Sequence, residues 1–169
     1  MRRLILLRHA KTEATAESGG DIERGLTDRG RRDAELVGRA LAEAGLAPDR
    51  VMVSTARRAR QTWEIMAALF PMARVNELRG LYLAGPDAIA RLVEDSQAEQ
   101  ADASVMVVGH NPGLHELALG LLGRGGGGPA DALAGSFPTA AAAVFAIDEA
   151  GGAQLEQFIL PRDLGGGVR

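Results

Sequence analysis

The apolar run at residues 4–7, Leu-Ile-Leu-Leu, ends directly at Arg8 and His9. A run this short and continuous, without the alternation of a half-exposed strand, is typical of a strand that is buried on both faces. In an open α/β sheet, ligands bind beyond the carboxyl ends of the strands. An arginine and a histidine at this point therefore indicate an anion site, while a surface loop with two solvated side chains explains the same residues equally well.

Two later apolar runs end in residues of the same kind. Residues 51–53 lead to Ser54 and then to a helix that carries Arg58, and residues 105–108 lead to His110. If the three strands are neighbours, two imidazoles and two guanidiniums surround one crevice. Guanidinium groups match the oxygens of a phosphoryl group bidentately, and a neutral histidine with one free ring nitrogen can attack phosphorus. The pattern therefore favours phosphoryl transfer, in which positioning and charge stabilisation dominate catalysis.

Helical patterns alternate with these strands, which predicts an α/β domain of three layers with helices on both faces of the sheet. Thr27 can cap the first helix through its hydroxyl. The last two apolar stretches, on either side of Gly151-Gly152, indicate a hairpin, so the mostly parallel sheet is expected to be mixed. Beyond the three strands already named, the expected elements are helices from 27, over 57–69, from 85 and over 114–122, strands over 74–78, 140–147 and 155–160, and loops at 10–25 and 123–128.

The composition limits the class of protein. The chain has 169 residues, a net charge of -3 and no cysteine. This length suits one domain, which we place at residues 1–162, with a flexible tail at 163–169. Nucleic-acid-binding proteins usually carry a basic face, and a chain without cysteine has no disulfide and no thiol nucleophile. No apolar stretch is long enough for a membrane span or a signal peptide. We expect a cytoplasmic protein without metal or cofactor that binds neither nucleic acid nor membrane.

Five ordered motifs, spread over most of the chain, form a recognisable set. They are Leu7-Arg8-His9-Ala10, Arg24-x-Leu26-Thr27-x-x-Gly30, Ser54-x-x-x-Arg58-Ala59-x-Gln61-Thr62, Val108-Gly109-His110-Asn111-Pro112 and Phe137-Pro138-Thr139-Ala140. Together they resemble the motifs of the histidine phosphatase superfamily, whose fold is phosphoglycerate mutase-like, and most of all those of its small SixA-like phosphohistidine phosphatases. The resemblance covers residues 3 to about 147. The family more often has glycine at the position of Ala10, and a methyl group is tolerable there unless the backbone needs a positive φ.

The resemblance implies a role for each residue of the crevice. His9 is expected to be the nucleophile that becomes phosphorylated. Arg8 and Arg58 are expected to bind the phosphoryl oxygens, and His110 is expected to be the second histidine, which stabilises the group in transfer.

Three further residues are candidates for supporting roles. Arg24 is expected to contact the substrate and the loop after the first strand. Asn111 is expected to brace the loop around His110, unless it is an ordinary turn residue before Pro112. Glu77 lies where many family members carry their proton donor, and a solvated loop carboxylate is the alternative interpretation.

The leaving group and the size of the crevice favour a protein substrate. A phosphorylated imidazole leaves readily once it is protonated, with a pKa of about 6.5 to 7, so it needs little help from Glu77. The segment between Glu77 and residue 105 has room for one helix but not for a large cap domain. An uncapped crevice suits a phosphorylated side chain on another protein better than a small metabolite, although the loop at 11–25 could fold over it.

We therefore expect a metal-independent phosphatase that acts through a phosphohistidine on His9, with phosphohistidine in proteins as the substrate. One alternative is a phosphomonoesterase for a small phosphorylated metabolite. The other is a catalytically inactive module that binds phosphate for regulation. The presence of both histidines and both arginines counts against the inactive module, and the oligomeric state stays open.

Overall fold

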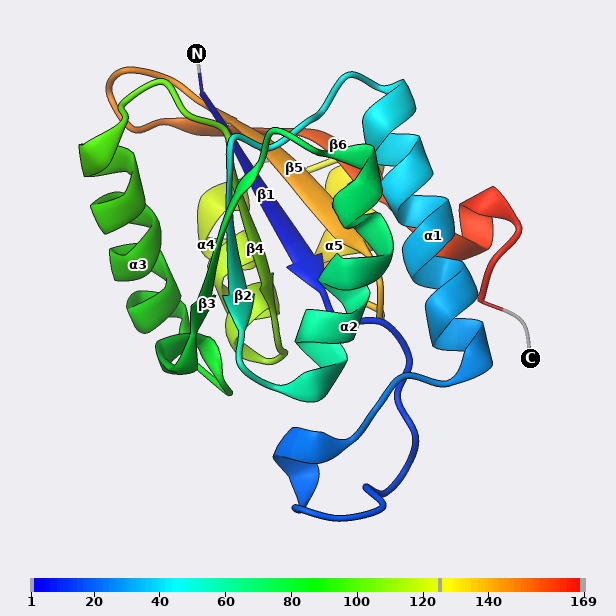
Figure 1. Cartoon of the computed structure of the whole chain (residues 1–169). Coiled ribbons are helices and arrows are strands. Elements are labelled where there is room, and N and C mark those ends of the chain that lie inside the picture. The colour runs from blue at the N-terminus through cyan, green and yellow to red at the C-terminus, as the bar shows by residue number, and fades with distance from the viewer. Residues whose placement is uncertain (1, 125, 168–169) are drawn as a thin grey trace.

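The computed structural model describes residues 2–124 and 126–167, and its centre is a six-stranded mixed sheet (Figure 1). The strand order is β3-β2-β4-β1-β5-β6. The first four strands of this order run parallel, whereas β5 is antiparallel to β1 and β6 is antiparallel to β5. The strands are β1 (Arg2–Arg8), β2 (Arg50–Ser54), β3 (Arg74–Leu78), β4 (Val105–Gly109), β5 (Ala142–Ile147) and β6 (Ala153–Ile159).

Helices cover both faces of the sheet, which confirms the three-layer α/β architecture predicted from the sequence (Figure 1). One face packs against α1 and α2, the other against α3, α4 and α5, and no cap domain covers the described part of the chain. No helix in this part is long and apolar enough to cross a membrane. The α-helices are α1 (Asp28–Glu43), α2 (Arg57–Met66), α3 (Pro86–Glu99), α4 (Gly113–Leu122) and α5 (Pro129–Gly135), and short 3-10 helices lie at Asp21–Glu23, Ala67–Leu69, Arg79–Leu81 and Pro161–Leu164.

The apolar run of β1 is continuous because both of its faces are buried. Ile5 and Leu7 belong to the core cluster under α1 and α2, and Leu4 and Leu6 belong to the cluster on the opposite face. Within the sheet, β1 lies between β4 and β5. This confirms the prediction of a strand buried on both sides, and it brings the carboxyl end of β1 to the middle of the sheet edge.

The structure differs from the predicted elements at two places. The sequence analysis does not predict α5, because this helix follows a glycine-rich segment and has a single large apolar side chain, Leu133, which is fully buried. The strand expected from residue 140 begins only at Ala142, because Ala140 has a φ of 60° and donates its N–H to the carbonyls of Arg8 and His9. Residue 125 of the expected glycine-rich connector lies outside the described residues.

The last described residues, 166 and 167, contact the segment before them and α1. Gly166 donates its N–H to the Pro161 carbonyl at 2.8 Å, and Gly167 donates to Oδ1 of the buried Asp33 at 2.9 Å. These bonds extend hydrogen-bonded structure past residue 162, where the sequence predicts a flexible tail. Residues 168 and 169 of that tail lie outside the described residues.

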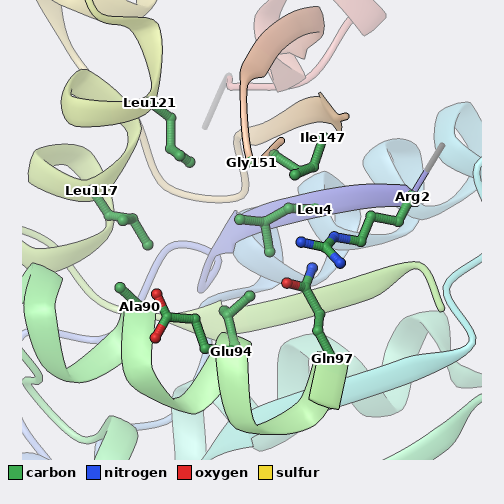
Figure 2. Close-up of a pocket in the computed structure, with 10 residues that line it drawn as sticks. Arg2, Leu4, Ala90, Glu94, Gln97, Leu117, Leu121, Ile147 and Gly151 are labelled. Atoms are coloured by element: carbon green, nitrogen blue, oxygen red, sulfur yellow. The ribbon is translucent and has the colours of Figure 1, made fainter. Parts of the chain in front are cut away.

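A small hollow of about 170 Å³ lies at the amino ends of the parallel strands, between α3, α4 and the start of β1 (Figure 2). Leu4, Leu117 and Leu121 give it apolar walls, and Figure 2 shows the Arg2 guanidinium next to the Gln97 amide. Because it lies at the other end of β1 from the predicted histidine pair, this hollow is separate from the candidate site.

Candidate active site

The carboxyl edge of the sheet brings the two predicted histidines together. Arg8 of β1 pairs with Gly109 of β4 in parallel register, so the next residues, His9 and His110, leave the sheet side by side. Their ring centroids are 5.3 Å apart. Ser54 ends the neighbouring strand β2, and its hydroxyl reaches His110. The convergence predicted from the three apolar runs is therefore present in the structure.

A hydrogen bond of His9 determines which of its ring nitrogens is free. Nδ1 lies 2.9 Å from the Ala10 carbonyl oxygen and donates its proton to it, so Nε2 keeps its lone pair. The residue is 7% exposed. Burial lowers the pKa of His9 to about 3, against the raising effect of the Ala10 carbonyl, and the nearby His110, Arg58 and Arg8 lower it further. The ring is therefore uncharged at neutral pH, as a histidine nucleophile must be.

His110 is held by a serine hydroxyl instead of a backbone carbonyl. Its Nε2 lies 2.7 Å from Oγ of Ser54, and the same Oγ accepts the N–H of Ala56 at 3.2 Å. A hydroxyl that accepts this N–H can still donate its own proton to Nε2, and in that arrangement neutral His110 carries its ring proton on Nδ1. That nitrogen is buried and has no hydrogen-bond partner within the described residues. Burial, followed by the charge of Arg58, lowers the pKa of His110 to about 4. A neutral ring with an unused N–H can donate to a phosphoryl oxygen.

Two guanidinium groups complete the predicted set. Arg8 donates from Nη1 to the Phe137 carbonyl at 3.0 Å. Arg58, in the first turn of α2, is 2% exposed and donates to the carbonyl and to Oδ2 of Asp21, at 2.9 and 3.1 Å. The Nε atoms of both arginines are buried and unpaired in the part of the chain that the structure describes. Burial and the charge of Arg58 lower the pKa of Arg8, so an anion with several oxygens would relieve this pair of cations.

Asp21 is a residue of this site that the sequence analysis misses. Its carboxylate accepts from the Tyr82 hydroxyl at 2.6 Å, from Nη2 of Arg58 at 3.1 Å and from Nε of Arg24 at 2.9 Å. The Tyr82 hydroxyl is the largest single cause that lowers the pKa of Asp21 to about 2, followed by Arg58 and Arg24, and the same bond raises the pKa of Tyr82. The spacing of Asp21 and Arg24, three residues apart, is a signal in the sequence, but only the fold brings Arg58 and Tyr82 to them.

The crevice in front of the histidines has a volume of about 420 Å³, which is within the usual range for ligand pockets. Two predicted binding residues, Arg24 and Asn111, line it. Asn111 donates from Nδ2 to the Phe137 carbonyl at 2.9 Å, the same carbonyl that receives Arg8, so it braces the loop as expected. The residues that line the crevice are Arg8, His9, Lys11, Thr12, Asp21, Arg24, Arg58, Leu83, His110, Asn111 and Thr139.

Glu77, the predicted proton donor, does not line this crevice. It is exposed on β3, the edge strand, in register with Val53 of β2. Two strands, β2 and β4, separate β3 from β1. The carboxylate in the crevice is instead that of Asp21, because the loop after β1 folds across the sheet edge toward α2.

Two close contacts position the loop after β1. The N–H of Ala10 donates to Oγ1 of Thr62 at 3.0 Å, and Thr62 in turn donates to the Arg58 carbonyl at 2.7 Å. Ala10 does not have a positive φ, so the backbone does not require the family's glycine here. Farther along, a Cβ on Gly30 would lie 2.2 Å from the carbonyl oxygen of Lys11, which explains the glycine at the start of α1.

Comparison with known proteins agrees with this geometry. The family model described as the histidine phosphatase superfamily (branch 1) matches residues 4–82. A structure of SixA from Agrobacterium tumefaciens is 30% identical, with a TM-score of 0.80 over 95% of this chain and 98% of that one. A structure of the protein histidine phosphatase SixA complexed with tungstate is 26% identical, with a TM-score of 0.78 over 96% and 99% of the two chains. An uncharacterized protein of Mycobacterium tuberculosis is 35% identical over 164 residues, which are 92% of this chain and the whole of that protein.

The mixed sheet with two histidines at its carboxyl edge is thus the fold of a phosphatase, and the chain belongs to the histidine phosphatase superfamily. Within that superfamily it is a member of the small SixA-like branch, which the full-length structural matches support.

Proposed function

We propose that the protein removes phosphoryl groups from phosphohistidine in other proteins, with His9 as the covalent nucleophile. The observation that carries this proposal is the free Nε2 of His9, whose ring is buried, uncharged at neutral pH and held through Nδ1 by the Ala10 carbonyl. The tungstate bound in the similar SixA structure supports it, because tungstate is a tetrahedral oxyanion like phosphate.

In the first step, Nε2 of His9 forms a bond to phosphorus while the bond between phosphorus and the substrate's imidazole nitrogen breaks. The electron pair of the broken bond stays on that nitrogen. A phosphoimidazole with a pKa of about 6.5 to 7 is partly protonated near neutral pH, so the protonated form releases a neutral imidazole. This step needs no proton from the protein.

Three side chains stabilise the charge on the phosphoryl oxygens. They are Arg8, Arg58 and His110, which all line the crevice and have N–H groups that can donate to these oxygens. Because phosphoryl transfer has a loose transition state, such preorganised donors are the main contribution of the protein. Asp21 orients Arg58 through two hydrogen bonds that leave Nε available.

In the second step, water attacks phosphorus and the bond to Nε2 of His9 breaks. The electron pair returns to the ring, which is again neutral with its proton on Nδ1. The product leaves as dihydrogen phosphate, which keeps the oxygen and both protons of the water, so the atoms and charges balance.

The choice of phosphohistidine over a phosphate ester depends on the proton donor. An alkoxide leaving group needs a proton from a general acid whose pKa is near the working pH. Among the residues that line the crevice, the one carboxyl group is that of Asp21, and hydrogen bonds hold its pKa at about 2. This carboxylate is ionised at neutral pH, so the crevice favours a leaving group that brings its own proton.

The test compares phosphate release from a phosphohistidine peptide, an aryl phosphate and a set of sugar phosphates, with His9→Ala as the control. We expect turnover of the peptide, and a phosphorylated wild-type protein that survives alkaline quench but not acid, because a phosphoramidate bond is acid-labile. Faster turnover of the sugar phosphates would support the phosphomonoesterase instead. A wild-type protein without turnover and a His9→Ala variant that still binds phosphate would support the regulatory module.

We also propose that residues 1–162 form one domain and that the protein is cytoplasmic.

We propose further that this phosphatase needs no metal ion. The described residues contain no group of three His, Cys, Asp or Glu side chains arranged to hold a metal. In this crevice Arg8 and Arg58 supply the positive charge that a metal gives other phosphatases. Activity should be the same before and after dialysis against a chelator, and a loss restored by added divalent cations would contradict this.

A further inference from the structure

Leu83 occupies an unusual place at the mouth of the crevice. It is the one apolar side chain among the described residues that line the crevice, and it is 56% exposed. The residue before it, Tyr82, contacts the site from the same segment: its hydroxyl donates to Asp21, and the edge of its ring faces His110 at a centroid distance of 5.6 Å. Leu83 therefore lies beside the phosphoryl site without taking part in its polar contacts.

The backbone of Leu83 is held in a conformation that leucine disfavours. Its φ is 51°, in the left-handed region, where a side chain crowds the backbone. The next residue is packed tightly, since a Cβ on Gly113 would lie 1.9 Å from the carbonyl oxygen of Ala84. This close approach at the start of α4 fixes the segment, and with it the direction of the Leu83 side chain.

Neither folding nor local conformation explains a leucine at this position. The neighbouring Leu81 is 1% exposed and belongs to the core, whereas Leu83 leaves more than half of its surface in water. Glycine or asparagine would suit the left-handed backbone better. A strained residue with an exposed apolar side chain beside a reactive site indicates a contact that forms only when a ligand is bound.

We propose that Leu83 is a specificity residue, which packs against the part of the substrate that carries the phosphoryl group. This inference rests on the proposed function, because a phosphohistidine in a protein offers the flat face of its imidazole and the chain around it. The remaining lining residues are polar or charged. Leu83 thus favours substrates with an apolar surface next to phosphorus over substrates that consist of the phosphoryl group alone.

The experiment compares two substrates that share a phosphorus–nitrogen bond. One is a protein that carries phosphohistidine, and the other is phosphoramidate, which has no organic part. The variants are Leu83→Gly and Leu83→Asn, both suited to the left-handed backbone, and Met72→Asn is the control, because Met72 is 89% exposed and outside the crevice. Burial of half a leucine side chain corresponds to a change of about five- to tenfold in kcat/KM.

We expect both Leu83 variants to lose about five- to tenfold in kcat/KM for the phosphoprotein, mainly through KM, and to keep the wild-type rate with phosphoramidate. The thermal midpoint should not fall, and Met72→Asn should change neither rate. Equal losses on both substrates, or no loss on either, would overturn the proposal.

Failure of the proposed function would be visible separately, in the wild-type protein. If the wild type does not hydrolyse phosphohistidine but hydrolyses an aryl phosphate, the same comparison is made between the aryl phosphate and phosphoramidate. A selective loss on the aryl phosphate would then support the role of Leu83 while the phosphohistidine proposal fails.

Discussion

Burial determines the protonation state of the two histidines. Burial holds the pKa of His9 at about 3 and that of His110 at about 4, so both rings are still neutral near pH 6.5 to 7, where a phosphoimidazole is already partly protonated. The nearby guanidiniums of Arg8 and Arg58 lower both values further. An anion-binding site thereby keeps its nucleophile uncharged without a separate base.

The pH dependence of stability should show these low values. Because the pKa of each histidine is lower in the folded than in the unfolded chain, the unfolded chain binds more protons between about pH 6.5 and 4. Stability is therefore full above pH 6.5 and falls as the pH falls through this window, by at most about 1.4 kcal/mol per pH unit for each histidine. Urea unfolding of wild type and His9→Gln between pH 7 and 4 measures this.

The His9→Gln variant should show a shallower loss of stability toward acid, because one of the two titrating rings is gone. Equal slopes for the two proteins would contradict the low pKa of His9. His115, whose Nε2–H donates to the Leu133 carbonyl outside the crevice, provides the matched control as His115→Gln.

The carboxylate of Asp21 places a negative charge beside Arg58 and Arg24 in the crevice. We expect Asp21→Asn to bind inorganic phosphate about five- to tenfold more tightly, since it removes a negative charge next to the anion but keeps the shape of the side chain. Calorimetric titration with phosphate measures this, and Glu17→Gln, an exposed change in the same loop, is the control. Weaker binding by Asp21→Asn would mean that Asp21 acts mainly to hold Arg58 in place.

At the scale of elements, the loop between β1 and α1 depends on one close approach. Lys11 accepts the N–H of Thr27 at 2.9 Å, and Gly30 lies directly beneath the same carbonyl. This contact joins the start of α1 to the loop that carries Asp21 and Arg24. The predicted cap of α1 is confirmed as well, since Oγ1 of Thr27 accepts the N–H of Gly30 at 3.0 Å.

Gly30→Ala should therefore damage both stability and activity. A Cβ at 2.2 Å from the Lys11 carbonyl forces backbone to move, which typically costs about 1 to 3 kcal/mol. Because the displaced loop carries Asp21, we expect kcat/KM to fall as well. Gly120→Ala in α4 has open space around its Cβ and should stabilise the protein by about 0.5 to 1 kcal/mol. Thermal unfolding and phosphatase assays of both variants check this, and a Gly30→Ala protein as stable as wild type would contradict it.

The elements also show where sequence patterns stop being informative. The buried strands and the first helix were predictable because continuous apolar runs and a Thr27 cap are local signals. Asp21 and Tyr82 were not, since their contact joins two loops 61 residues apart that share no periodicity. Glu77 was a candidate because its position along the chain fits the family, but the strand order places it on β3, outside the lining of the crevice.

On the scale of the whole molecule, charge is unevenly distributed. The chain carries a net charge of -3, but the crevice is lined by Arg8, Lys11, Arg24 and Arg58 with Asp21 as the single carboxylate among the described lining residues. The positive crevice attracts anionic substrates, and the acidic remainder of the protein repels them. The charge distribution therefore directs substrates to the crevice.

The rate of substrate capture should therefore depend on salt. We expect kcat/KM for the phosphoprotein to fall several-fold between about 0.01 and 0.15 M ionic strength, as the Debye length shortens from about 30 to 8 Å. Lys11→Gln should have a lower rate at low salt and a weaker salt dependence, whereas Arg39→Gln, which pairs with Glu35 and does not line the crevice, should match wild type. A salt dependence equal in all three proteins would contradict steering by the crevice.

The parallel register between Arg8 and Gly109 has a consequence for protein engineering. His9 and His110 each follow the last paired residue of their strand. A transfer of the two histidines to another sheet would therefore need two neighbouring parallel strands in this same register. Shortening either strand by one residue would turn one ring to the opposite side of the sheet, because side chains alternate along a strand.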